Sequence, residues 1–157
     1  MIAEKQGRIF SVCRITALAC FVLTVCFIWS NSMRTGFESS EQSGFFENIF
    51  KQIFNVTEEP FRFLYENLRK VAHFAEFALL GIEAACVLLL GQRRRMLRFA
   101  LTLLICFFVA AADETIQLFS PGRVASPLDV LLDSTGALCG SLLYCGMAKF
   151  FCLFKKK

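Results

Sequence analysis

Residues 71–90 have the sequence VAHFAEFALLGIEAACVLLL, an apolar run interrupted by only one histidine and two glutamates. A helix needs about 20 largely apolar residues to cross the roughly 30 Å hydrocarbon core of a bilayer. Three further runs of similar length lie at about residues 9–29, 97–117 and 127–148. We therefore predict an all-α protein, a polytopic membrane helical bundle with four transmembrane helices.

The composition supports a membrane protein with a single domain over residues 1–157. Of these residues 56% are apolar and 19% are charged, whereas soluble domains carry about 25% charged residues. The net charge is only +4, and the basic residues lie beside apolar runs rather than on a face with exposed aromatics. We therefore expect no nucleic-acid partner.

The eight cysteines lie within or at the edges of the apolar runs, and none forms a CxxC pair. The polar loops contain no cysteine, and no histidine lies beside a cysteine, so neither a disulfide framework nor a zinc site is indicated. We therefore interpret the cysteines as small hydrophobic side chains.

The orientation follows from the basic residues, which cluster in residues 5–14, 93–98 and 149–157. In a four-span chain all three clusters fall on one side of the membrane, which is the cytoplasmic side by the positive-inside rule. Both termini are thus expected in the cytoplasm. An alternative interpretation makes residues 9–29 a cleaved signal peptide, because basic residues precede the run and small residues follow it.

Residues 44–66 belong to the long outer segment and repeat phenylalanine and isoleucine at helical spacing until Pro60. We expect an amphipathic helix on the outer leaflet of the membrane. A soluble lid packed on the bundle is the alternative.

Three of the predicted spans carry charged and polar residues near their outer ends. Such groups cost roughly several kcal/mol inside a bilayer unless they are paired or hydrated, so each is a candidate functional residue. Within each span they recur at helical spacings of three or four residues, which places them on one face. They are Lys70, His73 and Glu76 on the second span, Asp113, Glu114 and Gln117 on the third, and Asp129 and Asp133 on the fourth.

The third span ends with two carboxylates, Asp113 and Glu114, at the negative end of the helix dipole. This arrangement is unfavourable by about 0.3–1 kcal/mol unless a cation compensates it. Arg123 in the following turn, Lys70 or a protonated His73 can supply the cation. We therefore predict one polar cluster that joins the three spans.

Two glycines, Gly136 and Gly140, form a GxxxG pair on the face of the fourth span that also carries Asp129 and Asp133. Such a pair lets another helix approach closely, which would carry the acidic residues into the bundle. As a local alternative, Asp129 completes a capping box with Ser126 at the start of the helix.

Other charged residues also have local interpretations. His73 can be a structural histidine at the interface, and Arg69 with Lys70 can anchor the second span at the headgroups. Glu83 lies near mid-membrane, where we favour a protonated interhelical hydrogen bond over a proton pathway, because no second acid lies at that depth.

The motifs Lys70–Phe77 and Asp113–Arg123, followed by Asp129 and Gly136, together resemble the VanZ family. The Ser-rich residues that follow the first span are also similar to members of that family. The resemblance implies a bacterial integral membrane protein that lowers susceptibility to the glycopeptide antibiotic teicoplanin without rebuilding the peptidoglycan precursor. It does not supply a mechanism.

Two functional hypotheses follow from the predicted cluster. In the first, which we favour, the protein is not an enzyme and needs no metal or other cofactor. Lys70, His73 and Arg123 bind the anionic group of an amphiphile at the outer leaflet, either membrane lipid, a glycopeptide antibiotic or a lipid-linked peptidoglycan precursor.

In the second hypothesis, the protein is an intramembrane enzyme acting on a lipid-linked substrate. His73 or Glu76 would be the general base, while Asp113, Glu114 and Asp129 would hold a divalent cation. The sequence contains no HExxH motif, nucleophile elbow or phosphate loop. A transporter is less consistent with four helices, although a homo-oligomer formed through the Gly136 face would be larger.

Overall fold

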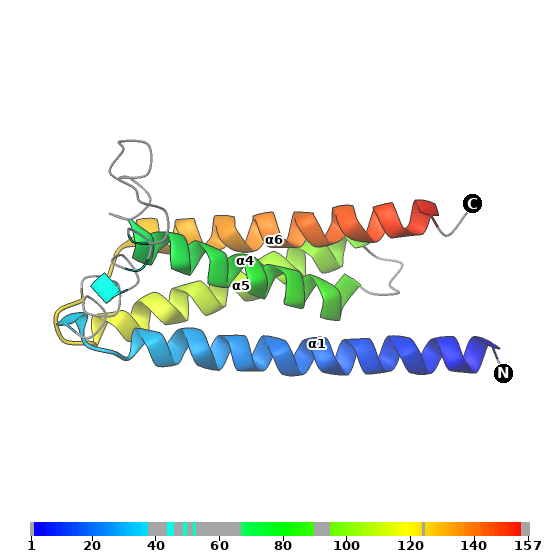
Figure 1. Cartoon of the computed structure of the whole chain (residues 1–157), viewed down its shortest axis with the longest axis horizontal. Helices are drawn as coiled ribbons and strands as arrows, with labels where there is room; N and C mark the ends of the chain where they lie inside the picture. The colour runs from blue at the N-terminus through cyan, green and yellow to red at the C-terminus, as the bar shows by residue number, and fades with distance from the viewer. Residues whose placement is uncertain are drawn as a thin grey trace.

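The computed structural model describes residues 2–37, 44–45, 49, 52, 67–89, 95–123 and 125–154. The described residues form long helices and contain no strand. The helices are α1 (Ile2–Ser32), α4 (Leu68–Leu89), α5 (Arg95–Leu118) and α6 (Pro127–Phe154). All four are long and apolar enough to cross a membrane, and Figure 1 shows them running alongside one another. This confirms the predicted all-α membrane bundle.

The predicted spans coincide with these helices to within a few residues, except that α1 and α6 extend further toward the chain termini. The predicted interfacial segment, residues 44–66, lies outside the described residues apart from residues 44, 45, 49 and 52. Its amphipathic helix therefore stays a prediction.

Helix α4 lies at the centre of the packing and contacts each of the other three helices. Its residues Phe77, Leu80 and Ala84 are buried in a core shared with Ile28 of α1 and Ala110 of α5. Many other apolar side chains remain exposed along the helices, as expected for surfaces that face lipid.

Helices α4 and α6 approach so closely that their backbones touch at glycines. A Cβ atom added at Gly140 would overlap the carbonyl of Ala78, and one added at Gly81 would overlap that of Ala137. Gly136 likewise lies against the carbonyl of Phe74. Only glycine permits this separation, and it brings the polar starts of the two helices together.

The C-terminal ends of α1 and α5 and the N-terminal ends of α4 and α6 share one end of the bundle (Figure 1). The turns that follow α1 and α5 are hydrogen-bonded to each other at this end. The backbone N–H of Gly36 donates to the carbonyl of Pro121 at 2.9 Å. The Ser120 hydroxyl donates to the carbonyl of Ser32 at 2.7 Å. Gly122 has φ of 77°, a left-handed conformation that favours glycine. We refer to this as the polar end.

Candidate functional site

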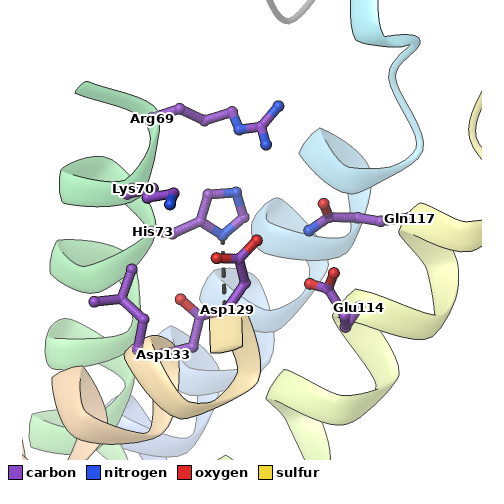
Figure 2. Close-up of a pocket in the computed structure, with 8 residues that line it drawn as sticks. Arg69, Lys70, His73, Glu114, Gln117, Asp129 and Asp133 are labelled. Carbon is purple, nitrogen blue, oxygen red and sulfur yellow. Dashed lines mark ion pairs between the residues drawn. The ribbon is translucent and has the colours of Figure 1, made fainter. Parts of the chain in front are cut away.

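Three helices each contribute one buried or half-buried ionisable side chain to the centre of the polar end. His73 Nδ1 of α4 lies 3.9 Å from Asp113 Oδ2 of α5 and 3.8 Å from Asp133 Oδ2 of α6. Figure 2 shows His73 and Asp133 pointing toward each other. Asp113 is fully buried and Asp133 is 2% exposed. The structure thus brings together residues from all three predicted polar faces.

Gln117 fixes the position of Asp113. Its side-chain amide donates to Asp113 Oδ2 at 2.9 Å, one helical turn back along α5. The same nitrogen lies 3.4 Å from the hydroxyl of Ser32 at the end of α1. Gln117 is itself buried, so the amide links α1 to the acid cluster.

Glu114 connects the end of α5 to the beginning of α6. Its Oε1 accepts the backbone N–H of Ser126, while the Ser126 hydroxyl accepts the backbone N–H of Leu128 at 3.2 Å. Ser126 is therefore an N-cap. In the capping box considered above for Asp129, the Asp129 side chain would accept the backbone N–H of Ser126. Glu114 accepts that N–H instead. Asp129 lies at the wall of a cavity.

This cavity measures about 10 Å³, roughly enough for one water molecule or ion. Acidic residues and His73 surround its interior, and the exposed side chains of Arg69 and Lys70 lie at its mouth (Figure 2). The lining residues are Arg69, Lys70, His73, Glu114, Gln117, Asp129, Leu132 and Asp133. Two cations at the surface thus lie above a group of recessed carboxylates.

Arg123 lies in the turn that follows α5 and does not line the cavity. Its Nη2 donates to the carbonyl of Asn31 at 3.1 Å. Burial lowers the pKa of its guanidinium, and the charges of Asp113 and Glu114 oppose this effect. A guanidinium remains charged in proteins, so Arg123 supplies positive charge near the C-terminal end of α5. Its hydrogen bond is made to the last turn of α1.

The two glutamates of α4 differ in their surroundings. Glu76 is half-buried one turn deeper than His73, and its carboxylate would repel that of Asp113 if both were ionised. Glu83 lies deeper still, and its Oε1 accepts a hydrogen bond from the Thr24 hydroxyl at 3.1 Å. This hydrogen bond joins α1 to α4, as predicted from the depth of Glu83, while the protonated state of its carboxyl stays a prediction.

Sequence reasoning missed several residues that shape the polar end. Arg69 was interpreted as a headgroup anchor, although it precedes His73 by four residues and therefore shares its helical face. Asn31 and Ser32, at the end of α1, and Ser120, after α5, contribute hydrogen bonds that join the two helix ends. Asn31 and Ser32 belong to the Ser-rich resemblance and Ser120 to the Asp113–Arg123 motif, but neither stretch carries a periodic signal that indicates these contacts.

The model of the VanZ/LLP1 family matches residues 17–152, which include about half of α1, all of α4 and α5, and nearly all of α6. Searches of curated proteins and of solved structures gave no match. The match covers most of the chain and agrees with the resemblance of the polar motifs, and the protein therefore belongs to the VanZ/LLP1 family.

Proposed function

We propose that this protein is a factor of the bacterial cell membrane that binds the anionic group of an amphiphile at the outer leaflet. In this proposal both termini lie in the cytoplasm and the polar end faces outward. The observation that carries it is the pair of exposed cations, Arg69 and Lys70, at the mouth of a cavity lined by acids.

The size of the cavity limits how a ligand binds. A space of about 10 Å³ does not admit a phosphate or a carboxylate headgroup, so the headgroup contacts Arg69 and Lys70 at the mouth. Charge-assisted hydrogen bonds from these side chains suit phosphate and carboxylate oxygens. The acids beneath them hold the cations in place by electrostatic attraction.

The apolar part of an amphiphile would lie along the exposed side chains beside the mouth. Leu128 is 72% exposed and Leu131 is 58% exposed on the first turns of α6. Both are at the depth where acyl chains begin if the polar end lies at the headgroups. The site therefore suits a ligand with an anionic group and an acyl or polyprenyl chain.

Two wall-related ligands have this chemistry. Teicoplanin carries an acyl chain that vancomycin lacks, and the lipid-linked peptidoglycan precursor carries phosphates on a polyprenyl chain. Binding of either one at the outer leaflet would reduce the encounter between the antibiotic and its target. We therefore propose that the protein lowers susceptibility to teicoplanin more than susceptibility to vancomycin.

The test is the susceptibility of a sensitive Gram-positive host that expresses the wild type or the double variant Arg69→Gln/Lys70→Gln. The wild type is expected to raise the inhibitory concentration of teicoplanin, and the double variant is expected not to. Lys149→Gln is the matched control, because Lys149 is an exposed cation at the opposite end of the bundle.

A binding measurement separates the two ligands. Purified protein in nanodiscs is titrated with teicoplanin, with vancomycin and with the lipid-linked precursor. Loss of binding in the double variant but not in Lys149→Gln would support the proposed site. Equal protection by the wild type and the double variant would refute it.

A further inference from the structure

His73, Asp113 and Asp133 place three potential metal ligands around a single point. One nitrogen of His73 and one oxygen of each aspartate all lie within 4.8 Å of one another. The three residues come from α4, α5 and α6, so three separate helices meet at this point.

The distances between these atoms are too long for hydrogen bonds. The two His–Asp separations are 3.8 and 3.9 Å, whereas an N–H···O bond measures about 2.7–3.2 Å. Nitrogen and oxygen ligands lie about 2.0–2.2 Å from a bound Zn²⁺ ion, which puts neighbouring ligand atoms about 3 to 4 Å apart. The observed spacing therefore suits side chains that share an ion between them.

Unsatisfied oxygens provide a second, independent observation. Asp113 Oδ1 and Asp133 Oδ1 are buried and have no hydrogen-bond partner within the described part of the chain. The two residues are 0% and 2% exposed. Buried carboxylate oxygens are normally hydrogen-bonded, paired or bound to a metal.

The charge balance indicates a divalent ion. A protonated His73 compensates at most one of the two buried carboxylates, and the other charged groups that face the cavity are Glu114, Asp129, Arg69 and Lys70. Arg69 and Lys70 are exposed at the mouth, and Arg123, whose charge also acts on Asp113, bonds to Asn31. Among the described residues, none of these three cations forms an ion pair with Asp113 or Asp133, whose ion pairs are with His73. A dication between Asp113 and Asp133 neutralises both.

The neighbouring contacts also suit a metal site. Gln117 donates to Asp113 Oδ2 at 2.9 Å, and this oxygen keeps a second lone pair that can bind an ion. Outer residues of this kind orient metal ligands in known sites. The cavity beside Asp133, of about 10 Å³, provides space for one water molecule as a further ligand.

We propose that His73, Asp113 and Asp133 form a binding site for one divalent transition-metal ion, with one ligand from each of three helices. One imidazole and two carboxylates suit Zn²⁺ or Mn²⁺. This site is independent of the proposed binding of an amphiphile at Arg69 and Lys70, because metal binding requires no ligand at the mouth of the cavity.

The test uses the purified full chain without a histidine tag. The protein is stripped with a chelator, dialysed against Zn²⁺ or Mn²⁺, and analysed for bound metal by mass spectrometry. We expect one ion per chain, with affinity reduced about 100-fold or more in Asp133→Asn, since even outer-shell changes cost about 10–100-fold. Glu83→Gln is the control, because it removes a carboxylate elsewhere on α4.

X-ray absorption of the Zn²⁺-loaded protein identifies the ligands. The chain has one histidine and eight cysteines, so the proposed site predicts one imidazole, oxygen ligands and no sulfur. His73→Gln provides a second variant if Asp133→Asn does not fold. Sulfur ligands, unchanged affinity in a folded variant, or no bound ion in the wild type would each overturn the proposal.

Discussion

The two ends of the helical bundle differ in whether their charged side chains are exposed or buried. At the end away from the cavity, Arg14, Arg95 and Lys149 are exposed, and Arg14 Nε donates to the carbonyl of Val87 at 3.2 Å. At the polar end, Asp113 and Asp133 are buried between helices. The basic side chains are long enough to reach the headgroups while their stems stay apolar, whereas the short carboxylates remain where the backbone places them.

This difference shows what holds the acids inside the bundle. The glycines of α4 and α6 remove the side chains that would otherwise separate the two helices. The close approach then positions His73 next to Asp133. Burial of the acids is thus a consequence of backbone contact, and it can be tested by changing the glycines, the hydrogen-bond partners and the deeper acid in turn.

The largest effect is expected at Gly140. Gly140→Ala places a methyl group against the carbonyl of Ala78, and overpacking of this kind costs about 1–3 kcal/mol. We expect the free energy of unfolding to fall by about 3 kcal/mol, because a backbone carbonyl cannot move aside. Unfolding in mixed micelles, followed by circular dichroism, measures the change.

Gly146→Ala is the matched control on the same helix. A Cβ atom at Gly146 meets nothing within 4 Å, so the substitution should leave stability unchanged or raise it by up to about 1 kcal/mol through helix propensity. Equal destabilisation by the two substitutions would show that the helices do not touch at Gly140.

A smaller effect is expected at Gln117. Gln117→Leu removes the donor to buried Asp113 Oδ2, and an unsatisfied buried acceptor costs about 1–3 kcal/mol. We expect a loss of about 2 kcal/mol in the same unfolding measurement. Thr115→Val is the control, since Thr115 is exposed on the same helix. A loss of the same size in the control would mean that the amide does not support the acid cluster.

The sequence predicted the spans well because a bilayer fixes the length and polarity of a helix that crosses it. It also predicted the polar faces of three helices, since helical periodicity determines which residues of one helix share a face. The clustering of these faces was predicted, but several hydrogen-bond partners between the helix ends were not. Glu114 accepts the backbone N–H of Ser126, and Arg123 donates to the carbonyl of Asn31. Both contacts depend on the rotation of the helices and the packing of the turns, and neither property has a local sequence signal.

The smallest effect is expected at Thr24, which tests whether an acid deep in the bundle behaves like those at the polar end. Thr24→Val removes the hydroxyl that donates to Glu83 Oε1 at 3.1 Å. Interhelical hydrogen bonds in membrane proteins contribute about 0.6 kcal/mol on average, and we expect a loss of that size. Glu83→Gln should change stability less, because its amide oxygen still accepts the bond. A double-mutant cycle with Glu83→Leu measures the coupling, and a coupling of several kcal/mol would mean that Glu83 is held as tightly as Asp113.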